Sequence, residues 1–390
     1  MQTYFDNAAT SFPKPGAVCD AMLTYQTCCG ASPGRGEYDR ARQASETLEK
    51  CRSLLCELVN APQSKHCIFT FNCSDALNLA IVGIADHFLQ RNELVHIVTT
   101  AMDHNSVLRP LDALQTRGVT HTIVNVDSDT GLVNPSDIAI AITPHTRLIV
   151  VAHGSNVTGT VQDIELIGSI CGEIPFLVDA AQTMGHYPID VQRMHIDLLA
   201  FPGHKGLLGP SGTGGLILKP GIEQILSPIR FGGTGSESDS PSQPTTLPDK
   251  YETGSHNMTG IAGLVAGLEW ILAQGVDTLQ SREQALCSQF IEEMNQCSSA
   301  TIVGPQTIDN RCSVFSLDFE ENPHEIAKRL EEMSGVQSRA GLHCAPFAHQ
   351  AMGTTVKGGT VRVSFGPFHT SNDISFLVDA ISNATQKVLI

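Results

Sequence analysis

The chain has 390 residues, of which 41% are hydrophobic and 16% charged, and a formal net charge of −16. This composition is typical of a folded globular protein with enough chain for two or three domains, and it excludes a largely disordered protein. The acidic balance argues against nucleic acid as a partner, because its phosphates would be repelled.

The first residues show no basic region followed by an apolar stretch, which argues against a secretory signal. No apolar run approaches the ~20 residues that a membrane-spanning helix needs. We therefore expect a cytoplasmic protein, in which the 12 cysteines are more typical of free thiols than of disulfides. No two of them form a C-x-x-C pair, so the sequence offers no support for a metal site.

Short apolar runs alternate with longer amphipathic runs between about residues 65 and 219. This alternation predicts an α/β fold with a mostly parallel, seven-stranded sheet covered by helices on both faces. Helices are predicted between most strands, for example at 74–89 and 162–172. The predicted strands are residues 66–71, 94–99, 120–126, 147–153, 175–179, 196–201 and 213–218.

A polar, proline-rich stretch at residues 232–249 follows this region and predicts a surface loop. Beyond it the pattern changes to shorter strands alternating with helices, which is typical of a smaller α+β domain. The predicted elements are helices at 259–274, 278–296, 323–334 and 372–388, and strands near 301 and at 312–319 and 360–365. We therefore predict a large domain of residues 15–257 and a small domain of residues 1–14 and 258–390.

Polar residues follow several of the predicted strands. Because ligands of parallel sheets collect at the carboxyl ends of the strands, we expect these residues to share one site. They are Asn72, Asp103, His104, Asn156, Asp179, His204 and Lys205.

Lys205 is the most informative of these residues. It stands in a glycine-rich turn after one apolar strand, and Asp179 ends a neighbouring apolar strand. This pair suits pyridoxal phosphate, since a lysine forms an imine with the cofactor and a carboxylate keeps its ring nitrogen protonated. The alternative for each residue alone is a surface lysine and an aspartate that caps a helix.

Ser74 stands at the start of the helix predicted after the first strand. Backbone amides and a hydroxyl at a helix N-terminus form a phosphate site. The alternative is an ordinary helix cap made by Ser74 and Asp75.

Four runs complete a pattern in chain order: DNAAT at 6–10, VDAAQ at 178–182, GHK at 203–205 and RAGLHCAP at 339–346. With these residues the chain resembles the cysteine desulfurase and selenocysteine lyase family, which are class V aminotransferase-like pyridoxal-phosphate enzymes of fold type I. The resemblance covers essentially the whole chain. It implies a homodimer with shared active sites.

The resemblance also implies individual roles around pyridoxal phosphate. Lys205 forms the imine and then shuttles protons, Asp179 pairs with the ring nitrogen, and His104 stacks on the ring and assists proton transfer. A strand-end histidine bonded to the backbone is the alternative for His104. The remaining residues implied to contact the cofactor or its phosphate are Cys73, Ser74, Asn156, Gln182, His204 and, from a second copy of the chain, Ser255.

On the substrate side, the resemblance implies that Arg362 binds the α-carboxylate, for which a planar guanidinium is well suited. The alternative is an outward-facing arginine in a surface ion pair. Arg339, Asn156 and Asn7 are the other substrate-side residues that the resemblance implies.

Cys344 falls at the nucleophile position of the family. Desulfuration requires a thiolate that attacks the sulfur of the substrate, and it leaves L-alanine and an enzyme persulfide. Such a cysteine is expected on an exposed loop, with its pKa lowered by neighbours such as His343 or Arg339. The alternative is a thiol that only packs.

The compact loop around Cys344 resembles the group II enzymes, which need a sulfur-accepting partner protein and also cleave selenocysteine. The chain departs from the family at Cys73, at Ser255, where threonine is usual, and at Tyr38, where many relatives carry histidine. The function implied is conversion of L-cysteine to L-alanine. Alternatives are a class V aminotransferase or β-lyase acting on another amino acid, and a non-enzymatic sulfur-carrier scaffold.

Overall fold

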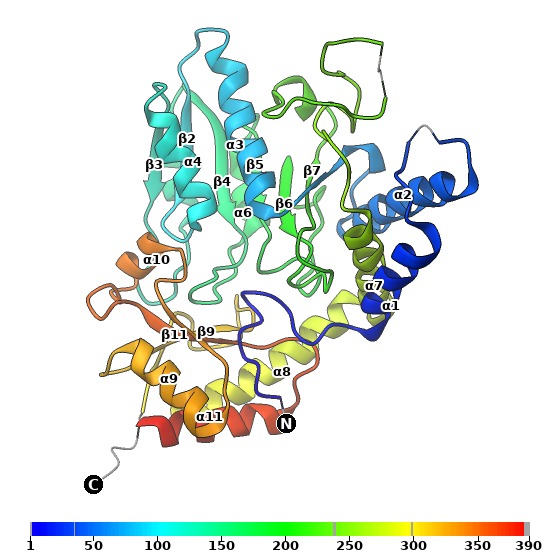
Figure 1. The fold of residues 1–390 in the computed structure, drawn as a ribbon. Coiled ribbons are helices and arrows are strands. Elements are labelled where there is room, and N and C mark those ends of the chain that lie inside the picture. The colour runs from blue at the N-terminus through cyan, green and yellow to red at the C-terminus, as the bar shows by residue number, and fades with distance from the viewer. Residues whose placement is uncertain (1, 35, 237–238, 298, 386–390) are drawn as a thin grey trace.

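The computed structural model describes residues 2–34, 36–236, 239–297 and 299–385, and it contains two sheets that form an upper and a lower body (Figure 1). The upper sheet consists of β1 (Cys67–Thr70), β2 (His96–Thr100), β3 (Thr120–Val124), β4 (Thr146–Ala152), β5 (Phe176–Asp179), β6 (Leu198–Pro202) and β7 (Gly214–Leu218). Its helices are α1 (Gly16–Thr24), α2 (Asp39–Val59), α3 (Cys73–Leu89), α4 (Asn105–Gln115), α5 (Pro135–Ala141), α6 (Ile164–Cys171) and α7 (Met258–Gln274).

The upper sheet has the strand order β1-β7-β6-β5-β4-β2-β3. The pairs β6–β5, β5–β4, β4–β2 and β2–β3 are parallel. Strand β7 is antiparallel to both of its neighbours, β1 and β6. β1 therefore runs in the same direction as β6, and only β7 is reversed. The predicted mostly parallel, seven-stranded sheet is confirmed, and the carboxyl ends of six strands meet at one edge.

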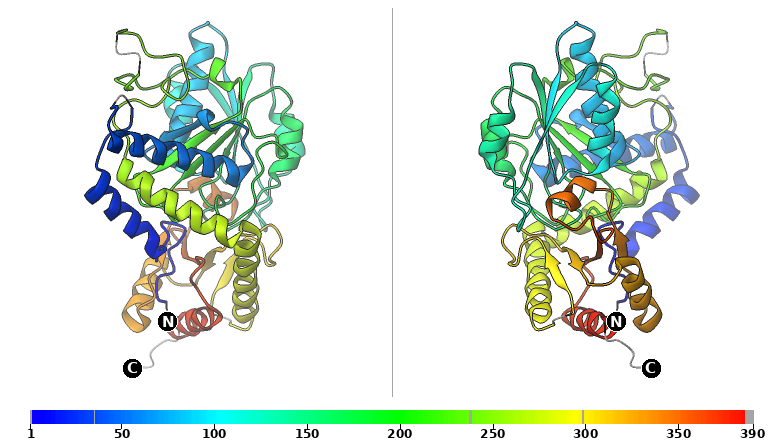
Figure 2. Two further views of the ribbon diagram at one scale, coloured as in Figure 1. Left: turned by 90° about the vertical axis from the view of Figure 1, so that its right-hand side faces the viewer. Right: turned by 90° about the vertical axis from the view of Figure 1, so that its left-hand side faces the viewer.

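Both faces of this sheet are covered by helices (Figure 2). In β4, Leu148 and Val150 pack in the core formed with α3 and α4, whereas Ile149 and Val151 pack in the core formed with α2, α6 and α7. Alternating side chains point to opposite faces of a strand, so an uninterrupted apolar run is needed when both faces are buried. Each such side chain contributes about 1.5–3 kcal/mol on burial.

The lower sheet has the order β10-β11-β9-β8 and is antiparallel throughout. Its strands are β8 (Thr301–Val303), β9 (Val314–Asp318), β10 (Arg339–Gly341) and β11 (Thr360–Ser364), and the accompanying helices are α8 (Val276–Asn295), α9 (Pro323–Ser334), α10 (Pro346–Ala351) and α11 (Ser371–Thr385). The last predicted helix, 372–388, extends into residues 386–388, which lie outside the described part of the chain.

The N-terminal segment joins the lower sheet before it reaches α1 (Figure 1). Tyr4 forms a β-bridge with Gln337, and Asp6 forms one with Ser364. The alternation along β11 points Val361 and Val363 into the core with α8, α9 and α11, so that Arg362 lies on the opposite face of the strand. That face abuts the upper body.

The structure agrees with the sequence pattern at residues 232–249 and differs from it before residue 65. The stretch 232–249 is irregular and mainly exposed over its described residues, as predicted. By contrast, no element had been predicted before residue 65, where α1 and α2 lie. Buried positions Ala41, Ala44, Cys51 and Leu55 of α2 recur at helical spacing, which is the signal that could have identified it.

Among the described residues, no single helix has both the length and the apolar character to cross a membrane. α7 and α8 pass by length and composition only as a pair, bent by 79°. Most of α7 is buried in the core on α1 and α2.

Candidate active site

The carboxyl edge of the upper sheet surrounds a cavity of about 120 Å³. This cavity brings together most of the cofactor residues implied by the sequence, which come from loops after β1, β2, β4, β5 and β6. They are Cys73, Ser74, His104, Asn156, Asp179, Gln182, His204 and Lys205. In the described part of the chain, no group of three or more His, Cys, Asp or Glu residues is placed to hold a metal ion.

Lys205 and Asp179 face this cavity from neighbouring strands. Burial, and secondarily the positive charge of Arg362, lowers the pKa of Lys205, which favours the neutral amine that imine formation requires. Burial raises the pKa of Asp179, although Oδ1 accepts a hydrogen bond from the Ala181 amide at 2.9 Å. A cation beside this carboxylate would offset the cost of burying its charge.

The anion-binding end of the cavity is the N-terminus of α3. Asn72 caps this helix, accepting a hydrogen bond from the Asp75 amide at 2.9 Å, and Asp75 Oδ2 accepts the Phe71 amide at 3.1 Å. Of the alternative cap by Ser74 and Asp75, only Asp75 therefore takes part. Ser74 instead shares a hydrogen bond of 2.6 Å with the Ser106 hydroxyl. The first amides of a helix have no acceptor within it, so this end presents donors to a phosphate.

Cys73 contributes to this end through its backbone. Its thiol donates to Asp179 Oδ1 at 3.4 Å. Burial and the adjacent carboxylate raise the pKa of the Cys73 thiol well above its ordinary value, so the thiol is neutral. The side chain therefore supports Asp179, and only the amide is left for the phosphate.

His204 is held by the N-terminal segment. Its Nδ1 lies 3.0 Å from Thr10 Oγ1, and burial lowers its pKa to about 4, so the ring is neutral at pH 7. The carbonyl oxygen of His204 is contacted at 3.1 Å by four donors: the Ser11 amide and hydroxyl, the Thr10 hydroxyl and the Lys14 ammonium. This arrangement fixes the peptide that precedes Lys205. The segment from Thr10 to Lys14 was not predicted to take part in the site.

His104 caps α4 through its ring. Nδ1 accepts a hydrogen bond from the Ser106 amide at 3.0 Å, which assigns the remaining ring proton to Nε2. Burial and the nearby charges of Lys205, Arg339 and Arg362 lower its pKa to about 4. At neutral pH His104 is therefore an uncharged ring that can lie against an aromatic cofactor and donate from Nε2.

Taken together, these residues fit pyridoxal phosphate. The cavity offers a lysine whose pKa is lowered, a buried carboxylate that forms no ion pair within the described residues, and helix amides for an anion. His104 and Gln182 line the wall between them. Gln182 is itself anchored, with its Nε2 donating to the Ala8 carbonyl at 3.1 Å.

Arg362 is buried and directed at the upper body. Its Nη2 lies 2.7 Å from Asp6 Oδ1, and its Nη1 donates to the Asn156 carbonyl at 3.1 Å. Its buried Nε has no hydrogen-bond partner among the described residues. The alternative of an outward-facing surface arginine is wrong, because the alternation of β11 leaves Arg362 on the face that meets the upper body. The sequence pattern gives no indication that Asp6 pairs with Arg362.

Cys344 lies in the turn between β10 and α10 and is exposed. Its carbonyl accepts the Asn105 amide at 2.8 Å, and the preceding carbonyl of His343 accepts the Asn156 side chain at 2.7 Å. Both His343 and Cys344 have positive φ, 49° and 58°. These contacts tie the cysteine turn to the residues beside His104 and to Asn156, which lines the cavity.

One expectation about this cysteine is not met. His343 is buried, its Nε2 lies 3.1 Å from Thr360 Oγ1, and burial lowers its pKa to about 2. A neutral imidazole turned into the protein core provides no positive charge for the Cys344 thiolate. Among the two suggested neighbours, only Arg339 remains as a cation.

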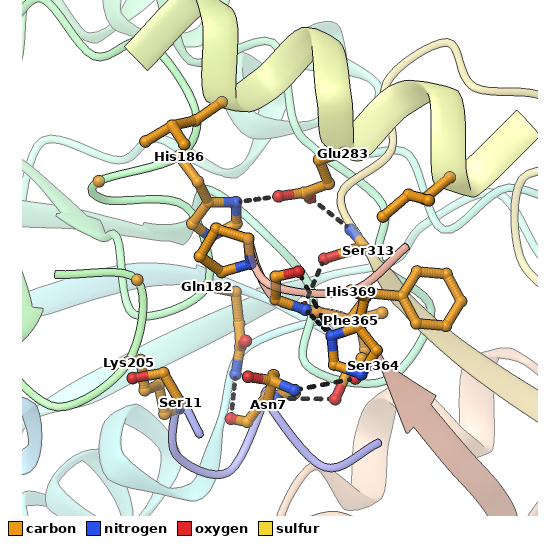
Figure 3. A pocket seen from close by; sticks show the side chains of 18 of the residues that line it. Asn7, Ser11, Gln182, His186, Lys205, Glu283, Ser313, Ser364, Phe365 and His369 are labelled. Carbon is orange, nitrogen blue, oxygen red and sulfur yellow. Dashed lines mark hydrogen bonds and ion pairs between the residues drawn. The ribbon is translucent and has the colours of Figure 1, made fainter. Parts of the chain in front are cut away.

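Asn7 and Ser255 are two further implied residues that do not line the lysine cavity. Asn7 lines a second cavity of about 270 Å³, which shares Gln182 and Lys205 with the first (Figure 3). Its Oδ1 accepts the Phe12 amide at 3.2 Å. The far wall of this second cavity carries the pair His186–Glu283, at 2.7 Å (Figure 3). Ser255 is exposed and does not line the lysine cavity of its own chain.

Comparison with known proteins agrees with this geometry. The family described as Aminotransferase class-V matches residues 3–377. A probable cysteine desulfurase of Methanothermobacter thermautotrophicus is 34% identical over 97% of this chain and 93% of its own, and a cysteine desulfurase of Yersinia pseudotuberculosis is 31% identical over 96% and 91%.

Solved structures give the same result. The apo structure of the cysteine desulfurase from Thermococcus onnurineus NA1 matches with a TM-score of 0.90 and 30% identity, covering 98% of this chain and 94% of that one. The cysteine desulfurase CsdA of Escherichia coli matches with a TM-score of 0.85 and 26% identity over the same shares. The chain belongs to the class-V aminotransferase family, and its relatives there are cysteine desulfurases.

Proposed function

We propose that this chain is a pyridoxal-phosphate-dependent cysteine desulfurase, which converts L-cysteine to L-alanine and takes up the sulfur on Cys344. The observation that carries the proposal is the position of Cys344. It is an exposed thiol whose backbone is bonded to Asn105, next to His104, and whose neighbour His343 is bonded to Asn156. These contacts hold an exposed thiol beside His104 and Asn156, which line the cavity that fits the cofactor, and this supports a nucleophilic role for Cys344. The family membership and the names of the relatives support the same reaction.

Pyridoxal phosphate, when bound, supplies the electron sink that labilises bonds at the α- and β-carbons of an amino acid. Lys205 would hold the cofactor covalently and, once released, move the α-proton. Asp179 would pair with the ring nitrogen, and Gln182 would donate to the ring oxygen. The amides of Cys73 and Ser74 at the start of α3, together with His204, would bind the phosphate.

The substrate would be oriented by its carboxylate. Arg362 is fixed by Asp6 and by the Asn156 carbonyl, which orient its positively charged guanidinium. Arg339 lies directly opposite Arg362 on the neighbouring strand and adds a second positive charge. Asn156 and Asn7 would complete the substrate side, Asn7 from the adjoining cavity.

Sulfur transfer would then occur between two thiols. The thiolate of Cys344 attacks the substrate sulfur, an S–S bond forms, and the bond from that sulfur to the β-carbon breaks. The electron pair of the broken bond stays with the β-carbon, which takes up the proton released by the substrate thiol and so becomes the methyl group of alanine. The sulfur is oxidised and the carbon reduced, so no external oxidant is required.

The protein would act as a homodimer in which Ser255 of one copy reaches the phosphate site of the other. A sulfur-accepting protein would remove the persulfide, as the compact cysteine turn of the group II type implies, and L-selenocysteine would be a second substrate. We also propose the division into a large domain of residues 15–257 and a small domain of residues 1–14 with 258–390, with one change: α7 belongs to the large domain, because it packs on α1 and α2.

The test compares the wild type with Cys344→Ser in assays of alanine and sulfide from L-cysteine, with a reductant present. We expect both proteins to be yellow and only the wild type to be active. The exposed Cys28 provides a matched control, since Cys28→Ser should retain full activity. Equal activity of wild type and Cys344→Ser would remove Cys344 from the mechanism and favour an aminotransferase or β-lyase. A colourless wild type would contradict the cofactor assignment and favour the scaffold.

A further inference from the structure

Ser255 is an exposed residue in a segment that is otherwise firmly anchored. Glu252, three residues before it, is 3% exposed at its side chain and forms a 2.6 Å ion pair with Arg52 of α2, which is also 3% exposed. The same carboxylate accepts the Phe69 amide of β1 at 2.6 Å and lies 3.3 Å from Nε2 of His256. Two hydrogen-bond donors, from α2 and β1, therefore converge on one buried carboxylate, and the His256 ring lies beside it.

Arg52 is equally constrained. Besides Glu252, it donates to the Cys67 carbonyl of β1, and its guanidinium lies 4.5 Å from the centre of the Phe69 ring. A buried ion pair is seldom a net source of stability, since hydrophobic side chains of the same volume are often as good or better. A buried pair with this many directed contacts does define one backbone arrangement.

The residues around Ser255 are fixed as well. The Gly254 amide donates to the Gly233 carbonyl at 2.7 Å, and the Asn257 side chain donates to the Gly212 carbonyl at 3.0 Å while capping α7. Ser255 is thus presented outward from a rigid support, although it does not line the lysine cavity of its own chain.

The surface beside Ser255 indicates what the serine faces. A hollow of about 30 Å³ is lined by Ser255, Phe71 and Arg230, and Phe71 leads directly into the α3 N-terminus, where the phosphate would bind. The side chains of Phe71 and Phe231 are 48% and 73% exposed. In a two-fold dimer each patch meets its own copy, so a patch that contains both Ser255 and the phosphate end can bring Ser255 of one copy to the phosphate end of the other.

We propose that the buried Arg52–Glu252 pair positions Ser255 for the phosphate site of a second copy of the chain, so that Arg52 and Glu252 are positioning residues of the partner's cofactor site. This inference rests on the proposed function, specifically on pyridoxal phosphate bound at Lys205. It goes beyond it by assigning a role to two residues that are remote from Lys205 in their own chain.

The experiment uses mixed dimers, purified with two different tags, and measures the dissociation constant of pyridoxal phosphate from the visible absorbance of the lysine-bound cofactor. In the first dimer, a chain with Lys205→Ala and Glu252→Gln is paired with a wild-type chain. Lys205 is then present only in the wild-type chain, and the Ser255 that reaches this site comes from the chain with Glu252→Gln. In the second dimer, a Lys205→Ala chain is paired with a Glu252→Gln chain, so the lysine-bearing site receives Ser255 from an intact support.

We expect roughly ten-fold weaker cofactor binding in the first dimer than in the second, because the first dimer loses one hydrogen bond to a charged group. The second dimer should match a dimer of Lys205→Ala with wild type. Ser255→Ala in place of Glu252→Gln should reproduce both results, because it removes the hydroxyl without touching the ion pair. Both dimers contain the same substitutions, so a general folding defect weakens them alike and cannot produce this difference.

If Glu252→Gln does not fold, the pair Arg52→Met with Glu252→Leu replaces it at similar volume. Equal affinities in the two dimers, or weaker binding in the second, would overturn the proposal. A wild type that shows no cofactor absorbance at all would overturn the proposed function, and this inference with it. An absorbing wild type without desulfurase activity would contradict only the reaction, because the dimer comparison reads cofactor binding alone.

Discussion

Arg339 on β10 and Arg362 on β11 occupy directly opposite positions of an antiparallel strand pair. Side chains at such positions share one face of the sheet and lie close together, and like charges there are unfavourable. Asp6 neutralises Arg362 in part, at 2.7 Å. A carboxylate bound at this face would relieve the remaining repulsion, which is a physical reason for an anionic substrate to bind there.

Replacing Arg362 by lysine should therefore impair substrate binding more than catalysis. Lysine keeps the charge but loses the planar donors that meet Asp6 and the Asn156 carbonyl. We expect kcat/KM for L-cysteine to fall by about 10- to 100-fold, mostly through KM. The control is Lys357→Gln, which removes a cation paired with Asp318 and should leave KM unchanged. An unchanged KM for Arg362→Lys would refute the assignment.

Gly159 should tolerate no side chain. Its φ is +74°, and a Cβ there would lie 2.2 Å from the Val314 carbonyl oxygen. We expect Gly159→Ala to lower the free energy of unfolding by roughly 3 kcal/mol or more, measured by urea denaturation. Gly16→Ala is the control, because Gly16 lies in α1 with nothing within 4 Å, and it should change stability by at most about 1 kcal/mol.

Acid should destabilise the protein through its buried histidines. Burial lowers the pKa of His153 to about 3 and that of His349 to about 4, below the ~6.5 of an unfolded chain. Between those values the unfolded state binds more protons, so stability is lost as the pH falls below about 6.5. We expect the pH slope of the unfolding free energy between pH 6.5 and 5 to be shallower in His153→Gln, by up to about 1.4 kcal/mol per pH unit. An identical slope would show that His153 binds protons equally in the folded and unfolded states.

Lys14 should affect the cofactor through the His204 carbonyl. Its ammonium donates to that oxygen at 3.1 Å, and burial lowers the pKa of Lys14 to about 8. Lys14→Met should weaken cofactor binding a few-fold at pH 7, because a charge-assisted hydrogen bond is lost. The difference from wild type should shrink at pH 9, where Lys14 has lost its charge.

Spectrophotometric titration at the two pH values measures this effect. Lys65→Met, at an exposed lysine far along the chain, provides the control and should bind like the wild type. A difference of the same size at pH 7 and pH 9 would show that the charge of Lys14 plays no part.

Much of the fold could be predicted because its signals are local. The central strands β4, β5 and β6 are mainly apolar runs bounded by polar turns, and buried parallel strands require such runs, whereas the edge strand β3 is more polar and more exposed. The pattern was weaker for β10, which has only three residues. The sequence pattern did not predict α2 either, because the apolar residues at helical spacing in this helix stand in a mainly polar stretch.

The residues around Lys205 could likewise be named in advance, since parallel strands deliver the residues after them to one edge. Contacts between segments far apart in the chain could not be predicted from the sequence. Asp6 meets Arg362, Lys14 meets the His204 carbonyl, and Arg52 meets Glu252. Each of these pairs depends on how layers pack, and no local pattern reports that.

By itself, the sequence thus determined the class of fold, the edge at which chemistry would take place and the residues able to carry it, because periodicity and strand-end residues are properties of short segments. Only the tertiary structure decided which way Arg362 faces, that His343 is buried and neutral beside Cys344, and that Ser255 is held away from its own lysine cavity. These depend on burial and on distances between separate elements, which arise only when the two sheets and the N-terminal segment pack together.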